Sequence, residues 1–453
     1  MKQWLDDRLQ LSDILESMFE HPVPKPSSFL DYLGFASFFL FINQAITGIL
    51  LAMVYVPSAS EAYNSIKLIH SSNIGGYIRS LHSWGANFMI VVVFLHLLRV
   101  FYEGAYKKPR ELTWILGVIL FIGTLGLGFT GYLLPWDQEG YWATTVGSAM
   151  ASYVPIVGDF IVRLLRNGAE VTGATLTRFY SVHMLILPNI VLIAFMPHFF
   201  FVLRQGMSAG DRLMAAKQRG EDVEKQSIPF WPNVAFRMIL FVLVIALGLW
   251  IMSAIYPKGL GNPADALNKD NYVPAPAWYF FGVYQLLKYF PASLDVVGIV
   301  VLPIVFFVVM FGLPWIDRNP AREARKRPIA LSIAGVLVVG LVLLTYQGIR
   351  SVPKPLPKTG VIDHPSYKKD VDPIFQSRCV GCHGNSGGYG GYGVDTYTNL
   401  TKKNIIPGNP DGSNLINMIS GKVQPQMPMG LAPLTKDQIQ TIRNWIKDGA
   451  PQN

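Results

Sequence analysis

Seven long apolar segments constrain what this chain can fold into more than any other feature. They lie at roughly 33–56, 79–102, 112–134, 179–204, 233–255, 295–316 and 329–349, and each has about the 20 residues that a bilayer-crossing helix needs. Only 15% of the 453 residues are charged, against about 25% in a typical soluble domain. The sequence therefore predicts an all-α protein with a seven-span transmembrane bundle. It excludes an ordinary cytosolic enzyme and a disordered chain.

Lysine and arginine predict the orientation of these helices, because cytoplasmic loops are enriched in both residues. They gather in alternate connections, at 103–111, 204–228 and 317–328. We therefore expect the N-terminus to be cytoplasmic and everything after residue 350 to lie on the outer side. The same loops account for the net charge of +9, so we expect no nucleic-acid partner. Residues 1–25 predict an amphipathic helix on the membrane surface.

The composition changes after the last apolar segment. Residues 351–364 begin with the Pro-rich sequence SVPKPLPKTG, which predicts a semi-rigid linker. Residues 365–453 then have the composition of a small soluble domain. The sequence thus predicts a membrane part and one outward-facing α-helical domain.

Two of the predicted transmembrane helices contain paired histidines, His82 with His96 and His183 with His198. Separations of 14 and 15 residues are close to four helical turns, so each pair lies on roughly one helix face. In the predicted topology the two helices are parallel, with His82 level with His183 and His96 level with His198. Facing imidazoles at two levels are typical of bis-histidine haem ligation in a bundle. Ordinary interhelical hydrogen-bonding histidines are the alternative, which leaves the matched depths unexplained.

Glycines repeat this spacing on the neighbouring helices. Gly34 and Gly48 are 14 residues apart in the first span, and Gly117 and Gly131 are 14 apart in the third. Because glycine has no Cβ, a flat macrocycle can approach the backbone closely at these positions. We therefore expect them to accommodate haem edges.

Two arginines, Arg79 and Arg99, flank the two histidine levels. They are candidates to pair with haem propionates. Long basic side chains that reach from a helix to the membrane surface would look the same in the sequence.

Five longer motifs resemble cytochrome b of the quinol-oxidising cytochrome bc complexes, and more specifically cytochrome b6 joined to subunit IV. They are RSLHSWGANF (79–88), KKPRELTW (107–114), GYLLPWDQEGYW (131–142), LTRFYSVH (176–183) and PAWYFFGVYQLLKYF (276–290). The resemblance covers about residues 1–350. It implies a b6-like four-helix haem domain at 1–205 and a subunit IV-like three-helix domain at 206–350.

The resemblance also implies residue roles. His82 and His183 would ligate a haem b near the outer surface, and His96 and His198 a second haem b near the inner one. Pro135–Trp142 and Pro276–Tyr279, which includes Trp278 and Tyr279, would line an outward-facing quinol-oxidation site. For the inner, quinone-reducing site, the sequence offers only Arg204 and the region of Asp31, by depth.

Two departures from the family pattern matter. Tyr32 stands where cytochrome b6 has a cysteine that binds an additional haem covalently, so we expect no such haem. The family's Pro-Glu-Trp-Tyr motif reads Pro276-Ala277-Trp278-Tyr279, so its usual carboxylate is missing.

Glu139 is the candidate replacement for that carboxylate. Oxidation of a quinol releases two protons, and a carboxylate near the outer haem is a natural acceptor for one of them. Glu139 lies in PWDQEGYW, where cytochrome b6 has an apolar residue. We predict that Glu139 accepts a proton while Tyr279 helps to position the quinol. The alternatives are that Asp137, which matches the b6 pattern, has this role, or that Glu139 is a solvated loop residue.

The C-terminal domain contains the sequence Cys379-Val380-Gly381-Cys382-His383. This is the attachment pattern of c-type haem, in which Cys379 and Cys382 form thioethers and His383 is an axial ligand. A zinc half-site or a redox CxxC is the alternative, but no second Cys/His pair is available for zinc. Attachment of c-type haem occurs outside the cytoplasm, in agreement with the predicted orientation.

The rest of this domain resembles a small single-haem cytochrome c. Met427, in Gln-Met-Pro, is the expected sixth ligand, with Met429 and Met418 as alternatives. Thr435 and Gln438 predict a capping box that begins a final helix with an apolar face. That face comprises Ile439, Ile442, Trp445 and Ile446.

Together these features predict a redox subunit of a quinol:cytochrome c oxidoreductase in a bacterial respiratory chain, embedded in inner-membrane lipid. The expected partners are a Rieske iron–sulfur protein, the quinone pool, a cytochrome acceptor and, by the resemblance, a second copy in a homodimer. The haem c would relay the high-potential electron. A transmembrane electron conduit without bifurcation is the alternative, which Ala277 keeps open.

Overall fold

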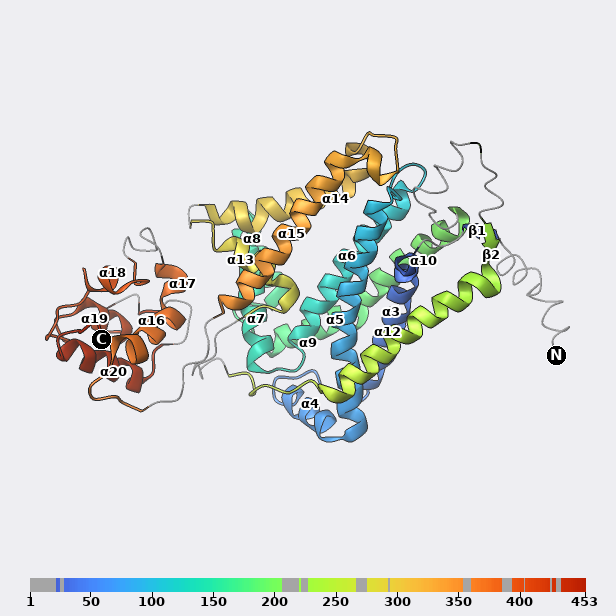
Figure 1. The fold of residues 1–453 in the computed structure, drawn as a ribbon. Helices are drawn as coiled ribbons and strands as arrows, with labels where there is room; N and C mark the ends of the chain where they lie inside the picture. Colours follow the sequence, from blue (N-terminus) through green and yellow to red (C-terminus); the bar gives the residue numbers. More distant parts are fainter. Residues whose placement is uncertain are drawn as a thin grey trace. The chain divides into compact units, whose positions relative to one another are not determined.

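A computed structural model provides the structure of the protein (Figure 1). It describes residues 22–24, 28–205, 220, 227–265, 275–291, 294–352, 360–384, 393–402, 404–423, 426–428 and 433–453. The amphipathic helix predicted for residues 1–25 lies outside the described residues, apart from a three-residue strand.

Within these residues, seven helices are long and apolar enough to cross a membrane, which confirms the predicted number. Four of them include a short 3₁₀ or π segment. The helices are Phe29–Ala52 (η1, Phe29–Tyr32, and α3, Leu33–Ala52), Asn73–Tyr102 (α5), Glu111–Tyr132 (α6), Gly173–Gln205 (α9, Gly173–Ser181, η3, Val182–Ile186, and α10, Leu187–Gln205), Phe230–Ile255 (η5, Phe230–Val234, and α12, Ala235–Ile255), Val297–Ile316 (η8, Val297–Val301, and α14, Leu302–Ile316) and Pro328–Arg350 (α15).

Local capping fixes where several of these helices begin. Ser28 and Asp31 form a reciprocal capping box before α3, and Thr172 and Thr175 form one before α9. The Ser72 hydroxyl accepts a hydrogen bond from the Gly75 amide, so α5 begins at Asn73, six residues earlier than its apolar pattern indicates. Each cap satisfies amide groups that the first helical turn leaves unpaired.

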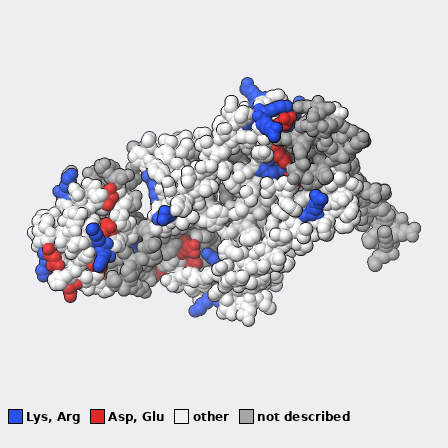
Figure 2. All heavy atoms as spheres, viewed as in Figure 1, with Lys and Arg blue, Asp and Glu red and all other residues white. Residues whose placement is uncertain are grey.

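The sides of the helices are apolar. Ile193, Phe236 and Val336 are among many large apolar side chains that remain exposed, as expected for a protein whose surface is solvated by lipid. On the face shown in Figure 2, charged groups are sparse along the helices, and Lys and Arg gather over the connection between α14 and α15. The chain is a multi-pass membrane protein.

Four helices frame the histidines. Helix α3 packs along α5, and α6 packs along α10, while α5 also contacts α6 and α12. The shorter elements of the connections are α4 (Ala62–Ser71), α7 (Gln138–Ala149), η2 (Met150–Tyr153), α8 (Gly158–Arg166), η6 (Trp278–Phe280), α13 (Phe281–Leu287) and η9 (Ala324–Lys326). Strands β1 (Pro22–Pro24) and β2 (Ser227–Pro229) pair antiparallel, with Val23 opposite Ile228.

The chain divides into two compact units. One comprises Met1–Ser152, Ile156–Asn262 and Pro303–Val339, and the other Tyr153–Pro155, Pro263–Leu302 and Gly340–Asn453. The first contains the four histidine-bearing and glycine-bearing helices. The second contains Trp278, Tyr279 and the C-terminal domain.

The described part of the C-terminal domain contains six short helices around an apolar core of its own. They are η10 (Tyr367–Val371), α16 (Asp372–Arg378), α17 (Val380–His383), α18 (Tyr397–Thr401), α19 (Asn414–Ile419) and α20 (Lys436–Lys447). The predicted capping box is confirmed: Gln438 N donates to Thr435 Oγ1 at 3.1 Å, and Thr435 N donates to Gln438 Oε1 at 3.0 Å. Ile442, Trp445 and Ile446 are fully buried in the core.

Candidate functional site

His82 and His183 face each other inside the helical bundle. His82 lies on α5 and His183 on η3, and their ring centres are 6.2 Å apart with 74° between the ring planes. Two imidazoles that share one metal at metal–nitrogen distances of about 2 Å have ring centres about 6 Å apart. The spacing therefore fits an iron held between them. We call these residues the outer pair, after the predicted topology, and His96 with His198 the inner pair.

A glycine on the neighbouring helix faces each of the four histidines. The distances from a Cβ placed on the glycine to the histidine Cε1 are 2.6 Å for Gly131–His183, 3.0 Å for Gly34–His96, 3.2 Å for Gly48–His82 and 3.5 Å for Gly117–His198. The shortest of these is closer than any side-chain carbon can approach. The missing side chains therefore make room for the imidazoles.

Threonine hydroxyls fix the protonation of the outer pair. Thr47 Oγ1 lies 2.9 Å from His82 Nδ1, and Thr130 Oγ1 lies 3.1 Å from His183 Nδ1. Each hydroxyl donates its own proton to a carbonyl one turn back on its helix, at 2.6 and 2.8 Å. Each must therefore accept from the imidazole, so Nδ1 carries the proton. Nε2 is left with the lone pair that a metal requires.

The inner pair is held differently. His198 Nδ1 donates to the Thr113 carbonyl on α6 at 2.9 Å, which again leaves Nε2 as the free acceptor. His96 Nδ1 has no hydrogen-bond partner among the described residues. His96 and His198 are near enough for the charge of one imidazole to act on the other.

A π turn at His183 reconciles the unequal spacings of the two pairs. The turn η3 spans Val182–Ile186, and it precedes Pro188, which has no amide proton to donate to the carbonyl four residues back. A π turn inserts one residue into an α-helix. The 15 residues between His183 and His198 therefore turn through about the same angle as the 14 between His82 and His96.

Arg79 and Arg99 make contacts with the protein in this structure. Arg79 is buried and donates to the carbonyls of Lys258 at 2.6 Å and Gly259 at 2.9 Å. Arg99 forms ion pairs with Asp31 at 2.9 Å and Glu103 at 2.7 Å. Arg79 thus holds the loop after α12 against α5 through two hydrogen bonds. Arg99 connects α5 to η1, at the start of the first transmembrane helix.

Glu139 lies in the first turn of α7, and its side chain is 43% exposed. The Tyr132 hydroxyl donates to its Oε1, and Lys258 Nζ lies 3.8 Å from its Oε2. Asp137, by contrast, is buried and caps α7 by accepting from Gly140 N at 2.9 Å. Burial raises the pKa of the Asp137 carboxyl. Glu139 is therefore the accessible carboxylate of this segment, and Asp137 has a structural role.

Trp278 and Tyr279 belong to the other compact unit. They form the 3₁₀ turn η6 directly after Ala277, with ring centres 5.6 Å apart in an edge-to-face arrangement. Trp278 is exposed, whereas burial raises the pKa of the Tyr279 phenol to about 12. The phenol is therefore protonated at neutral pH and can donate a hydrogen bond.

In the C-terminal domain, Cys379 and Met427 pack against the same apolar core. His383 ends α17, and its amide donates to the Cys379 carbonyl at 2.9 Å. The Met427 amide donates to the Met418 carbonyl at 3.1 Å, which brings the Gln-Met-Pro turn beside α19. The Cys382 side chain and Met429 lie outside the described residues.

Comparison with known proteins agrees with this geometry. Residues 18–206 match the family described as cytochrome b/b6/petB, and residues 263–366 match cytochrome b(C-terminal)/b6/petD. The chain is 33% identical over 371 residues to "Cytochrome b" of Rickettsia conorii, which covers 78% of this chain and 87% of the relative. The chain belongs to the cytochrome b family.

Other relatives extend the likeness. A "Cytochrome bc complex cytochrome b subunit" from Chlorobaculum thiosulfatiphilum is 35% identical over 353 residues, covering 76% of this chain and 79% of the relative. The solved structure "Hyperthermophilic respiratory Complex III" superposes with a TM-score of 0.68 at 27% identity, covering 79% of this chain and 92% of that one. Residues 379–429 match the family model "Planctomycete cytochrome C". A cytochrome b with a C-terminal cytochrome c domain implies haem b and haem c as cofactors.

Sequence reasoning missed the residues that support the histidines of this cytochrome b. Thr47 and Thr130 each directly precede one of the spaced glycines, so the repeated Thr-Gly step was the available signal. Tyr132 and Lys258, which contact Glu139, carried no such signal. Lys258 reaches it from a loop far along the chain.

Proposed function

We propose that this protein is the redox subunit of a quinol:cytochrome c oxidoreductase within a multi-subunit bc-type complex. One observation carries the proposal. The bundle holds two pairs of histidines, each histidine is faced by a glycine on a neighbouring helix, and the same chain continues into a domain with the CVGCH motif. Complex III and bc-complex titles among its relatives support the same assignment.

The facing histidines and the CVGCH motif support a specific set of haem ligands. His82 with His183 and His96 with His198 would hold two haems b through Nε2, and Cys379, Cys382, His383 and Met427 would hold one haem c. When bound, these groups supply one-electron carriers across the membrane and on its outer side. Residues 1–205 would then form a b6-like four-helix haem domain and residues 206–350 a subunit IV-like three-helix domain, with 351–364 as the linker to the cytochrome c domain at 365–453.

At the outer site, Glu139 would accept a proton from quinol. Its side chain is 43% exposed, which gives a proton a path to solvent, and it is positioned by contacts with the Tyr132 hydroxyl and Lys258 Nζ. The protonated Tyr279 would donate a hydrogen bond to a quinol oxygen, and the exposed Trp278 ring would offer an apolar surface beside it.

The partners follow from this chemistry. In a bifurcating reaction the two electrons of the quinol take different acceptors. These would be the membrane haems and a separate Rieske iron–sulfur protein, with haem c as the high-potential relay to a cytochrome acceptor. The basic inner loops support a cytoplasmic N-terminus and a periplasmic cytochrome c domain in a bacterial inner membrane. A homodimer is proposed from the family alone.

The proposal is tested on the purified complex. We expect haem b and haem c in a ratio of two to one and quinol-dependent cytochrome reduction, together with a Rieske-type EPR signal in the same sample. A ratio of three to one would mean that one haem site has been missed.

A second candidate is a non-bifurcating conduit between a periplasmic redox partner and the quinone pool. Ala277 favours it, because the family's carboxylate is absent there. Two b haems and reversible reduction by quinol without any Rieske signal would select this candidate.

A further inference from the structure

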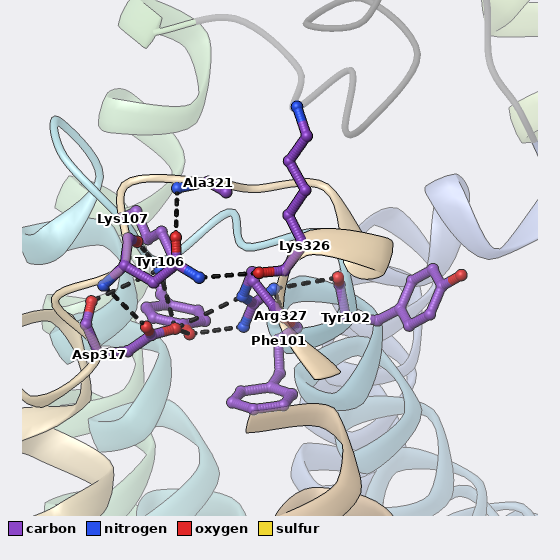
Figure 3. Close-up of polar contacts among 9 residues, drawn as sticks. Phe101, Tyr102, Tyr106, Lys107, Asp317, Ala321, Lys326 and Arg327 are labelled. Atoms are coloured by element: carbon purple, nitrogen blue, oxygen red, sulfur yellow. Dashed lines mark hydrogen bonds and ion pairs between the residues drawn. The ribbon is translucent and has the colours of Figure 1, made fainter. Parts of the chain in front are cut away.

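A buried charge network lies beyond the end of α5 (Figure 3). Asp317 Oδ2 accepts from the Tyr106 hydroxyl, lies 2.8 Å from Lys107 Nζ and lies 3.4 Å from Arg327 Nε. Lys107 also donates to the carbonyl of Asn319. The side chains of Lys107 and Asp317 are 8% and 12% exposed, and that of Arg327 is 0% exposed. The family motif KKPRELTW contains this lysine, and the proposed function assigns it no role.

Arg327 connects the network to the helix that bears two of the histidines. Its Nη1 donates to the carbonyls of Phe101 at 3.0 Å and Tyr102 at 3.2 Å, which are the last residues of α5. Its Nη2 donates to the Tyr106 hydroxyl at 2.6 Å. The guanidinium also lies 5.2 Å from the ring centres of both Phe101 and Tyr106. Arg327 therefore caps the C-terminal end of α5, whose final carbonyls have no helical partner.

The network retains one uncompensated positive charge at neutral pH. Burial acts to raise the pKa of Asp317, but hydrogen bonds from Lys107 and Tyr106 and the charges of Lys107 and Arg327 outweigh it, so the pKa is lowered. Burial lowers the pKa of Lys107, which the hydrogen bond and charge of Asp317 oppose. Among the described residues that form ion pairs with Lys107 and Arg327, Asp317 supplies the one carboxylate, so two cations meet one anion. The Arg322 guanidinium adds further positive charge near Lys107.

The side chains between this charge and the inner histidine pair along α5 and α6 are mostly apolar. The charged residue between His96 and Phe101 in the sequence is Arg99, which forms ion pairs with Asp31 and Glu103. Phe101 follows His96 by five residues, or about 8 Å along the helix axis. Phe101 and the buried Tyr106 belong to an apolar cluster that also contains buried Trp114 and Val118 with Leu97, Val100, Met310, Phe311 and Leu313. Leu97 follows His96 and Val118 follows Gly117, which faces His198. In such a medium a charge is screened far less than in water.

We propose that the Tyr106–Lys107–Asp317–Arg327 network sets the reduction potential of the haem that the inner pair holds. This inference rests on the proposed function, because the presence of a haem between His96 and His198 is part of that proposal. An iron that gains an electron becomes less positive, so a nearby excess cation favours the reduced state and raises the potential. The four residues act through the field and through the fixed end of α5. They are positioning residues and do not contact the substrate.

Redox titration of both b haems in the purified complex tests this. Asp317→Asn removes the anion and is expected to shift the inner-haem potential upward. Lys107→Met removes a cation and is expected to shift it downward. The double variant has the wild-type net charge and is expected to return the potential toward the wild-type value. The outer-haem potential is the internal reference in each sample.

Two further variants separate charge from structure. Arg325→Gln removes one cation from the exposed part of the same loop, and it is expected to shift the inner-haem potential by less than half as much as Lys107→Met. Arg327→Lys keeps the positive charge but loses the planar guanidinium that donates to Phe101, Tyr102 and Tyr106. It is expected to lower thermal stability with little change in the inner-haem reduction potential.

The outcomes distinguish this inference from the proposed function. Shifts of the same sign in Asp317→Asn and Lys107→Met, or no shift in either, would overturn the electrostatic role while two titrating b haems kept the proposed function intact. If Asp317→Asn does not assemble, Lys107→Met decides by itself, since an unchanged potential contradicts the inference. A wild-type complex without a second bis-histidine haem would refute the proposed function itself.

Discussion

Thr47 and Thr130 have the same role on two different helices, and in the sequence each is marked only by the spaced glycine that follows it. A threonine in an apolar helix ordinarily bonds to its own backbone, and both residues do so. Their second contact, to a histidine Nδ1, depends on packing between helices. The histidines and glycines could be found because their spacing repeats along one chain segment, whereas a contact across helices has no such period.

Replacing Thr130 by valine is predicted to weaken retention of the outer haem. Valine has a similar shape but cannot accept the Nδ1 proton at 3.1 Å, so His183 loses its fixed tautomer. Loss of such a partner typically lowers metal affinity by about 10-fold or more. The measurement is the rate of haem loss in detergent, with Thr124→Val as the control. Thr124 donates to the Leu120 carbonyl on the same helix, so its loss should change retention little.

Replacing Glu139 by glutamine is predicted to slow quinol oxidation by roughly 10-fold or more, the effect typical of a lost proton acceptor. Haem content should stay normal, because the side chain is 43% exposed and its hydrogen bond and ion pair are with Tyr132 and Lys258, not with a histidine. The matched control is Asp137→Asn. Asparagine can still cap α7, so turnover should be retained. Unchanged turnover and pH dependence in Glu139→Gln would favour the non-bifurcating conduit.

At the scale of the helices, the sequence pattern and the structure agree on number and type, and one of the irregular turns in the structure bears directly on the histidines. Apolar length and low charge predicted all seven spans. The 15-residue separation of His183 and His198 could be judged only approximately from a regular helix. The π turn η3 absorbs the additional residue, and its cause is the proline after it, which sequence reasoning did not connect with the histidine.

The glycine positions are predicted to differ in tolerance. Gly131→Ala should abolish binding of the outer haem, because its Cβ would lie 2.6 Å from His183 Cε1. Gly117→Ala should retain the inner haem, because the corresponding distance to His198 is 3.5 Å, an ordinary contact. Haem b content per protein measures both. Equal losses in the two variants would show that the glycines act through something other than clearance around the imidazoles.

For the whole molecule, the separate core of the C-terminal domain predicts separable defects. Trp445 is fully buried against Tyr367 and Tyr397, and its Nε1 donates to the Pro451 carbonyl at 2.9 Å. Trp445→Ala should cost about 3–5 kcal/mol and lower haem c content, while both haems b remain. Trp445→Phe, which keeps a ring in the core, should lose much less haem c. A parallel loss of haem b in the alanine variant would mean that the two parts do not fold independently.

Since this independently packed cytochrome c domain belongs to the same polypeptide as the membrane helices, dilution cannot separate them. Two parts joined by a short linker meet at an effective concentration in the millimolar range, whatever the amount of protein present. A freely diffusing carrier, by contrast, depends on encounters that salt slows by screening charge. Under the proposed function, the step of electron delivery that is sensitive to ionic strength and to carrier abundance is therefore the encounter of the tethered domain with the protein that oxidises it.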